Sequence, residues 1–400
     1  MADPATAPPL TRASVQEAHK LIRPYVHRTP VLTNATLTAL ASTPRAAADL
    51  DGTPWAGRTP ARPVLRLWFK CENLQRTGAF KVRGAFHALA RLQRDDAAWA
   101  ASGGRSRGVV THSSGNHAQA LALAARESGL PAYVVMPTVS AAPKIAATRG
   151  YGATVIFSGS TSVEREEVTA RVVEETGARL VPPYDHPDIM LGQGTMGLEL
   201  QEQVAELMAA GPGAAEGPSG LDRAPVTRER VVPPAASGKT GLDAMITPCG
   251  GGGMLSGVAL SAEGTGIKVF AAEPSFEGGD DGMRGYYAGR RVERVSTLTI
   301  ADGLRTPLGV HPWGVIYERR LVAGMYSVTE EEIKAALRLV YERFKMVVEP
   351  SAVVGLAVAL YNEDFRAMVE KEAGEDGWDL GIVFSGGNVS LENLGNLFAA

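Results

Sequence analysis

Short apolar runs and longer amphipathic segments alternate along the middle of the chain. Residues 108–115, GVVTHSSG, predict a short buried strand that ends in a polar loop, and residues 116–129 predict a helix closed by Gly129. Strands follow at 131–137 and 153–157, with helices at 142–150 and 162–177. Strand and helix in alternation at this spacing predict a parallel sheet with helical crossovers.

The same order returns later in the chain. Residues 242–262 predict a strand, a glycine loop and a helix, and further buried strands are expected at 64–70, at 267–274 and near the C-terminus in WDLGIVFSGGNVS, 378–390. The fold class is therefore α/β. A chain of 400 residues is long enough for two domains, or for one large domain with an insert.

Two stretches interrupt the pattern. Residues 41–63 are rich in Pro, Ala and Thr, and residues 211–241 hold five prolines and six glycines. Both predict surface loop insertions rather than domains of their own, because neither contains a periodic apolar pattern.

Composition excludes several classes of protein. The net charge of −3 and the pI near 6.2 give no reason to expect nucleic acid or an anionic membrane as a partner. Cys71 and Cys249 are the only cysteines, too few for a disulfide framework or a cysteine zinc site. No run of eighteen apolar residues and no signal peptide is visible, so we expect a cytoplasmic protein.

The segment RTGAFKVRGA, 76–85, places Lys81 among small and apolar residues. Taken alone, this pattern more often belongs to a surface lysine at the start of an amphipathic helix. The alternative is a lysine whose amine performs chemistry, with small neighbours that let a ligand approach the backbone.

Two further motifs lie where a predicted strand meets a predicted helix, which is where α/β sheets bind ligands. In THSSGNHAQA, 111–120, hydroxyls and backbone N–H groups at a helix N-terminus suit a carboxylate, although such residues are more often a plain helix cap. In CGGGGM, 249–254, four glycines between apolar elements let backbone N–H groups surround a phosphate. The loop lacks the spacing of a dinucleotide-binding or Walker motif.

Two more segments end predicted strands. FSGGNVS, 384–390, brings Ser385 into a glycine turn, which is also what an ordinary β-turn contains. AAEPSFEGGDD, 271–281, offers carboxylates and carbonyls of the kind that Mg²⁺ or Ca²⁺ prefers, although an acidic solvated loop looks the same.

Lys81 in TGAFKVRGA, SSGNHAQA, CGGGGM and SGGN, in that order, resemble the pyridoxal-phosphate enzymes of fold type II, above all the serine racemase and serine/threonine dehydratase group. Matching stretches run from about Leu21 to Leu394. The resemblance implies two open, twisted parallel-sheet domains with the cofactor in the cleft between them. It assigns 1–107 and 187–400 to a large cofactor-binding domain and 108–186 to a small one.

The resemblance also implies roles for individual residues around pyridoxal 5′-phosphate. Lys81 would bond to the cofactor and later remove the substrate Cα proton, and Ser114 would act on the opposite face. Asp302, in TIADGLRTPLG, would face the substrate. The remaining cofactor residues would be Phe80, Asn116, Gly250, Gly251, Gly252, Gly253, Met254, Glu349 and Ser385, and the substrate carboxylate would bind at Ser113, Ser114, Gly115, Asn116 and His117.

The subgroup implied by the resemblance carries a divalent-cation site, which here would consist of Glu273, the carbonyl of Gly279 and Asp281, for Mg²⁺ or Ca²⁺. The spacing from Glu273 to the aspartate pair is about two residues longer than the usual pattern. The resemblance further implies a homodimer that acts on small amino acids.

Three functions stay open at this point. The first is dehydration or racemisation of β-hydroxy amino acids such as L-serine, L-threonine or 3-hydroxyaspartate, which gives a keto acid and ammonia or the D-amino acid. The second is a specialised β-eliminating or β-replacing reaction on a natural-product precursor. The third is a catalytically silent homologue that only binds ligands, against which the retention of Lys81, Ser114, the glycine loop and Ser385 argues.

Overall fold

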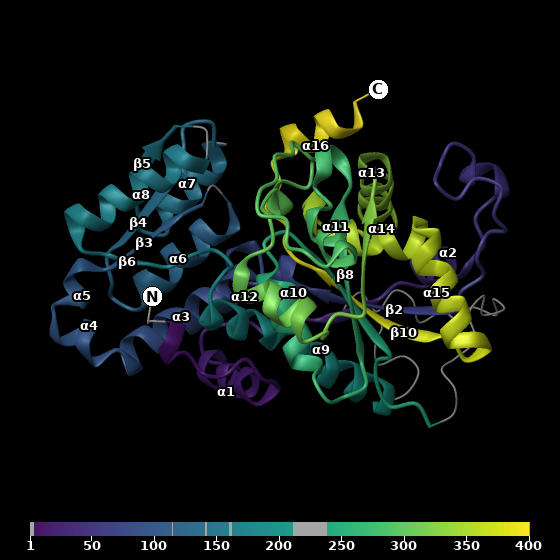
Figure 1. The fold of residues 1–400 in the computed structure, drawn as a ribbon, viewed down its shortest axis with the longest axis horizontal. Coiled ribbons are helices and arrows are strands. Elements are labelled where there is room, and N and C mark those ends of the chain that lie inside the picture. The colour runs from purple at the N-terminus through teal and green to yellow at the C-terminus, as the bar shows by residue number, and fades with distance from the viewer. Residues whose placement is uncertain (1–3, 114, 141, 160–161, 211–237, 400) are drawn as a thin grey trace.

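The computed structural model describes residues 4–113, 115–140, 142–159, 162–210 and 238–399. Its strands form one sheet of six and one sheet of four, which lie in the right-hand and left-hand parts of Figure 1. The strands are β1 Val31–Thr33, β2 Leu65–Cys71, β3 Val109–His112, β4 Ala132–Pro137, β5 Thr154–Ser158, β6 Arg179–Leu180, β7 Ala244–Pro248, β8 Lys268–Pro274, β9 Gly324–Val328 and β10 Trp378–Phe384.

The six-stranded sheet has the order β1-β2-β10-β7-β8-β9, and every neighbouring pair is parallel except β1 and β2. Its central strands are apolar on both faces because helices cover both. Helices α2 Ala35–Ser42, α13 Glu330–Leu339, α14 Val354–Tyr361 and α15 Glu363–Ala373 lie on one side, and α9 Pro187–Ala210 and α10 Gly253–Ala262 on the other. We call this sheet with its helices the large lobe.

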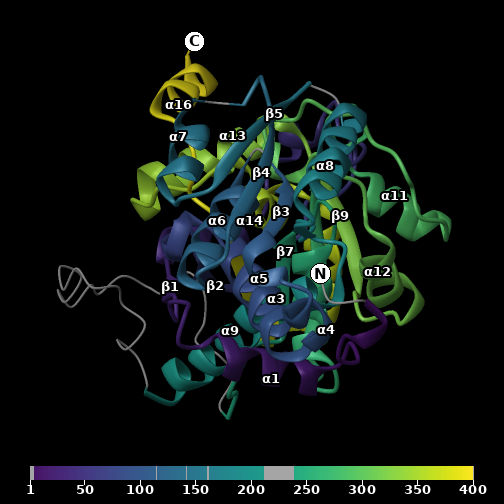
Figure 2. The same ribbon diagram turned by 90° about the vertical axis from the view of Figure 1, so that its left-hand side faces the viewer.

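The four-stranded sheet has the order β5-β4-β3-β6 and is parallel throughout. Alternate side chains of its strands face opposite sides. Val109 and Val134 pack in one apolar cluster with α6 Asn116–Glu127, whereas Val110 and Val135 pack with Val172 of α8 Ser162–Thr176. Helix α7 Ala142–Gly150 completes what we call the small lobe (Figure 2).

Helix α3, Lys81–Asp95, lies between the lobes and packs against both α6 and α9. Arg83 in its first turn is fully buried and donates to the carboxylates of Glu72 and Glu199 at 2.8 to 2.9 Å. Lys70 of β2, also fully buried, donates to Glu199 at 2.7 Å. A buried cation that lost these partners would be strongly destabilising, so the pairs fix the start of α3 on the large lobe.

The remaining helices surround this core. They are α1 Arg12–Ile22, α4 Ala97–Ala101, α5 Gly104–Arg107, α11 Asp281–Ala288, α12 Val310–Trp313 and α16 Leu391–Phe398. Shorter 3₁₀ or π turns are η1 Pro4–Thr6, η2 Ala47–Leu50, η3 Glu72–Leu74, η4 Arg76–Gly78, η5 Phe276–Gly278, η6 Asp302–Leu304, η7 Gly314–Glu318, η8 Val340–Phe344, η9 Pro350–Val353 and η10 Gly374–Asp376.

The predicted α/β architecture with two sheets is confirmed, and every strand and helix predicted along 108–177 is present. One edge departs from the expected all-parallel pattern, because β1 turns back antiparallel on β2. The first predicted insertion, 41–63, begins inside α2 and continues as a segment that packs on α15, with Arg366 donating to the carbonyl of Ala61 at 3.4 Å. Most of the second insertion, 211–241, lies outside the described residues. The domain boundaries stay a prediction.

None of the helices in the described part of the chain combines the length and the apolar character that a membrane span requires.

Candidate functional site

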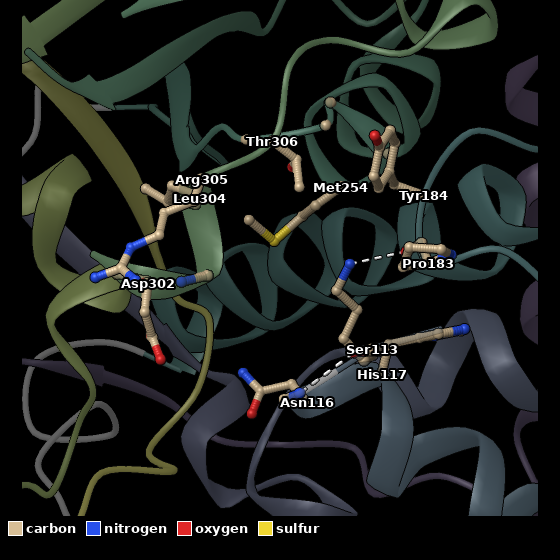
Figure 3. Close-up of a pocket in the computed structure, with 18 of the residues that line it drawn as sticks. Ser113, Asn116, His117, Pro183, Tyr184, Met254, Asp302, Leu304, Arg305 and Thr306 are labelled. Atoms are coloured by element: carbon tan, nitrogen blue, oxygen red, sulfur yellow. Dashed lines mark hydrogen bonds between the residues drawn. The ribbon is translucent and has the colours of Figure 1, made fainter. Parts of the chain in front are cut away.

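A cavity of about 920 Å³ opens between the two lobes and is lined by residues of both (Figure 3). Its walls come from the ends of β3, β7 and β10 and from the starts of α3, α6 and α10. The predicted site residues that line it are Phe80, Lys81, Ser113, Gly115, Asn116, His117, Gly250, Gly251, Gly252, Gly253, Met254, Asp302, Glu349 and Ser385. Ser114 lies outside the described residues, and Glu273, Gly279 and Asp281 lie away from the cavity lining.

Lys81 is the first residue of α3, and its side chain is half-buried at the cavity. Its Nζ donates to the carbonyl of Pro183 at 2.8 Å. Burial lowers the pKa of Lys81 to about 8, against the opposing effect of the nearby Glu349 carboxylate. The amine is therefore neutral in a far larger fraction of molecules at pH 7 than a solvated lysine, and a neutral amine is a nucleophile and a base.

The glycine loop leaves β7 and enters α10 at Gly253. Gly252 has φ of 82°, a backbone conformation that favours glycine. A Cβ on Gly251 would overlap the ring of Tyr184, and a Cβ on Gly253 would lie 2.9 Å from the Tyr184 carbonyl oxygen. The loop is thus closely packed on one side and presents backbone N–H groups at a helix N-terminus to the cavity, an arrangement that binds phosphate.

The segment before Lys81 is joined to the segment after β10. Phe80 N donates to Ser385 O at 3.0 Å, and Gly387 N donates to Gly78 O at 2.9 Å. Ser385 is buried at the cavity, and its hydroxyl has no hydrogen-bond partner among the described residues. Backbone hydrogen bonds, which do not depend on side chains, therefore fix the segment that carries the Ser385 hydroxyl against Phe80, the residue before Lys81.

Asn116 begins α6 and connects the small lobe to the floor of the cavity. Its Nδ2 donates to Glu349 Oε1 at 2.8 Å, and its Oδ1 accepts from Asn388 Nδ2 at 2.8 Å. Glu349 is buried, and that burial, followed by the negative charge of Asp302, raises the pKa of its carboxyl to about 7. Figure 3 shows Asn116 reaching into the cavity from below.

The loop before α6 carries the predicted carboxylate-binding residues. Ser113 N donates to Val135 O at 3.1 Å, and Ser113 Oγ accepts from Gly115 N at 3.3 Å. The ring of His117 turns toward the β6 side, where Nε2 lies 3.2 Å from Val181 O. Burial, and then the charge of Lys81, lower the pKa of His117 to about 3, so its ring is neutral and only its backbone is left for a substrate carboxylate.

Asp302 lies at the cavity, as predicted, but its carboxylate already has a partner. Lys144 Nζ, from α7 of the small lobe, lies 2.6 Å from Asp302 Oδ2, on the large lobe. Both side chains are partly exposed, so this is an ion pair that bridges the two lobes in the cavity wall.

The predicted cation ligands are buried behind the glycine loop. Glu273 is 1% exposed, and its Oε1 has no hydrogen-bond partner in the described part of the chain. Burial and then the charge of Asp281 raise the pKa of Glu273 well above its ordinary value. Glu273 Oε2 accepts from Met283 N at 2.7 Å, in the first turn of α11, which begins at Asp281. Within the described ranges no group of three or more His, Cys, Asp or Glu side chains is arranged to hold a metal ion, so any cation here needs backbone oxygens as well.

Several residues of the cavity were not predicted from the sequence. Tyr184 and Pro183 come from the connection between β6 and α9, and Lys144 comes from α7. No motif marks these three positions, since only folding brings them to the site. Asn388 is different, because it stands in the SGGN motif and could have been found there.

The chain resembles known proteins over nearly its whole length. Residues 52–220 and 235–377 match the family described as "Pyridoxal-phosphate dependent enzyme". It is 39% identical to the serine racemase of Arabidopsis thaliana over 387 residues, which cover 96% of this chain and 95% of that protein. It is 36% identical to the L-threo-3-hydroxyaspartate ammonia-lyase of Saccharomyces cerevisiae, over 97% of this chain and 98% of that one.

Among solved structures, the maize serine racemase superimposes with a TM-score of 0.74 at 36% identity, over 96% of each chain. The matched family spans most of the chain, including the lysine and the glycine loop. The four motifs, the cavity that gathers them and these matches agree, and the chain belongs to the family of pyridoxal-phosphate-dependent enzymes.

Proposed function

We propose that this protein catalyses racemisation and β-elimination of β-hydroxy amino acids such as L-serine, L-threonine or 3-hydroxyaspartate. The observation that carries the proposal is that the amine of Lys81, with its pKa lowered to about 8, shares one cavity with the glycine loop of α10. The substrate class is supported by the relatives, which are a serine racemase and a hydroxyaspartate ammonia-lyase.

The residues of the cavity fit pyridoxal 5′-phosphate. Gly250 to Gly253 leave a cradle that Cβ atoms would fill, at the N-terminus of α10, for the phosphate. Ser385 offers a buried hydroxyl that bonds to no described residue for the ring nitrogen, and Asn116 an amide N–H for the ring hydroxyl. When bound, the cofactor supplies an aldehyde that captures amines and a ring that withdraws electrons from the substrate Cα–H bond.

Lys81 serves twice in this proposal. Its neutral amine would hold the aldehyde of the cofactor, and as a free amine beside the substrate it would take the Cα proton onto Nζ. The carbonyl of Pro183, 2.8 Å from Nζ, keeps the amine at the cavity wall between these steps. Phe80 and Met254, which line the same cavity, exclude water around it.

The substrate carboxylate binds at the loop before α6, where backbone N–H groups of Gly115, Asn116 and His117 lie at the helix N-terminus. We assign Ser114 the proton on the opposite face of Cα on the resemblance alone. Delivery of that proton gives the D-amino acid. Departure of the β-hydroxyl as water, followed by hydrolysis, gives the keto acid and ammonia instead.

We also propose that a divalent cation, Mg²⁺ or Ca²⁺, binds at Glu273, the carbonyl of Gly279 and Asp281. The buried Oε1 of Glu273 has no hydrogen-bond partner among the described residues, and the negative charge of Asp281 acts on the Glu273 carboxylate, a repulsion that a bound cation or a proton would relieve. The site would act on the glycine loop through the backbone, since Leu308 N donates to Asp281 Oδ2 at 3.3 Å and Gly309 N donates to Gly251 O at 3.1 Å.

The test is an assay of keto acid and of D-amino acid from a panel of β-hydroxy amino acids, with the purified protein and added cofactor. Release of either product from L-serine, L-threonine or L-threo-3-hydroxyaspartate supports the proposal. A visible absorbance of bound cofactor without turnover of any panel member would favour the specialised β-eliminating or β-replacing reaction. Absence of that absorbance would favour a silent binding protein. We further propose a cytoplasmic homodimer, which light scattering on the purified protein tests for its dimeric part.

A further inference from the structure

The orientation of the Asn116 amide is determined by a chain of three hydrogen bonds. Asn388 Nδ2 donates to the backbone carbonyl of Thr77 and to Asn116 Oδ1, each at 2.8 Å, and Asn116 Nδ2 donates to Glu349 Oε1 at 2.8 Å. The two ends of a side-chain amide are distinguished only by their partners. Here the backbone carbonyl of Thr77 determines the orientation of the Asn388 amide, because a backbone carbonyl accepts hydrogen bonds and never donates them.

The chain therefore admits one assignment. The Asn388 atom facing Thr77 O must be the NH₂ group, so the Asn116 atom that the same NH₂ group reaches must be the carbonyl oxygen. The NH₂ group of Asn116 then faces Glu349. We propose that Asn388 is a positioning residue, which fixes Asn116 as a hydrogen-bond donor toward Glu349 and toward the cofactor in the cavity. This inference rests on the proposed function.

The turn before Lys81 is shaped around Asn388. Thr77 has φ of 59°, a left-handed conformation that is unfavourable for threonine and directs its carbonyl into the site. Gly78 follows with φ of 69°, and a Cβ there would lie 2.8 Å from Asn388 Oδ1. The strained turn and the absence of a side chain at residue 78 together leave the space that Asn388 occupies.

Without Asn388, the donor to Asn116 Oδ1 is lost, and the Asn116 amide is free to turn its oxygen toward Glu349 and the cavity. The Asn116 oxygen would then face any acceptor atom that the cofactor presents, and it would also face the carboxylate of Glu349. Both contacts place two acceptors against each other. The NH₂ group of Asn116 has a second N–H that bonds to no described residue. This N–H is left for a ligand in the cavity, while the first N–H keeps its hydrogen bond to Glu349.

The test is cofactor binding by the apoprotein, measured by titration with pyridoxal 5′-phosphate and followed by protein fluorescence. Asn388→Asp keeps the size of the side chain but removes both donors. We expect it to raise the cofactor Kd about tenfold or more, the usual effect of losing a hydrogen bond that involves a charged group. Asn396→Asp, on the exposed face of α16, makes the same charge change away from the site and should leave the Kd as in the wild type.

The role through Asn116 is tested by a double-mutant cycle. In an Asn116→Ala background, Asn388→Asp should raise the Kd by less than about twofold further, because the amide that Asn388 orients is gone. Equal effects in both backgrounds would overturn the inference, as would an Asn388→Asp protein with a lower melting temperature and an unchanged Kd. A wild-type protein without affinity for the cofactor would instead refute the proposed function, and the inference with it.

Discussion

At the scale of single residues, the chemistry of the site depends on how Lys81 is surrounded. The residues that follow it, Val82 and Arg83, are fully buried, and Phe80 before it is nearly so. Helix α3 thus begins inside the protein, and burial lowers the pKa of Lys81 to about 8 from about 10.5.

The lowered pKa predicts how capture of the cofactor depends on pH. Only the neutral amine attacks an aldehyde, so the rate of covalent attachment to the apoprotein should rise about tenfold per pH unit below pH 8 and level off above it. Absorbance stopped-flow from pH 6 to pH 10 measures this rate. Lys371→Ala, at an exposed position of α15, should give the same profile. A rate that is still climbing at pH 10 would contradict the lowered pKa.

Asp302 gives a second prediction at this scale. Its carboxylate pairs with Lys144 in the cavity wall, so Asp302→Asn removes a negative charge and frees a cation beside the substrate. The KM for L-threo-3-hydroxyaspartate should fall several-fold, whereas the KM for L-serine, which has no second carboxylate, should change little. Stability should change by less than about 1 kcal/mol, because the pair is partly exposed. Equal changes in the KM values for the two substrates would show that Asp302 does not discriminate between them.

At the scale of elements, the glycine loop and the start of α10 form the most demanding part of the site. Gly251 and Gly253 face Tyr184, and Gly250 approaches Leu304 so closely that a Cβ would lie 2.9 Å from its Cα. These contacts explain why four glycines stand in succession, since all four are packed by neighbours from other segments and Gly252 also has a positive φ.

Gly251→Ala should therefore displace the loop from Tyr184 and raise the cofactor Kd by about tenfold to a hundredfold, the effect of an overpacked contact of 1–3 kcal/mol. Equilibrium titration of the apoprotein measures it. Gly395→Ala in α16 is the matched control, because a Cβ there meets nothing within 4 Å. If the two variants bound the cofactor equally well, the loop would not be the phosphate site.

The helices and strands also show which features of the fold can be predicted from the sequence. The motifs and the strands around them were predicted because each carries its pattern within about ten residues of chain, as in β3 with α6 and β7 with α10. Strands β1 and β6 have three and two residues, which is too short for an alternation of apolar and polar side chains to be recognised. Lys144 and Tyr184 reach the cavity only through tertiary packing, and a pattern of neighbours in sequence says nothing about such contacts.

At the scale of the whole molecule, two lobes meet at the cavity and a pair of buried carboxylates lies behind it. Helix α3 packs against α6 and α9, and so connects the lobes directly behind Lys81. Backbone hydrogen bonds of Leu308 to Asp281 and of Gly309 to Gly251 link the proposed cation site to the glycine loop.

Occupancy of the cation site should therefore stabilise the fold and the cofactor site together. Millimolar Mg²⁺ should raise the melting temperature of EDTA-treated protein and lower the cofactor Kd, by linkage to the folded state. Glu273→Gln should abolish the response to Mg²⁺, whereas Glu375→Gln, at an exposed turn far along the chain, should keep it. Identical melts with EDTA and with Mg²⁺ would show that these carboxylates bind no cation.

Removal of the substrate Cα proton by Lys81 is the step on which the proposed function depends most directly. The decisive measurement is NMR of L-serine incubated with the cofactor-loaded protein in D₂O, with Lys81→Ala alongside. The wild type should replace the Cα proton by deuterium while D-serine, pyruvate or both accumulate, and Lys81→Ala should slow every one of these changes by at least about a thousandfold, since it lacks both the attachment point and the base. Exchange at the wild-type rate in Lys81→Ala would contradict the central claim.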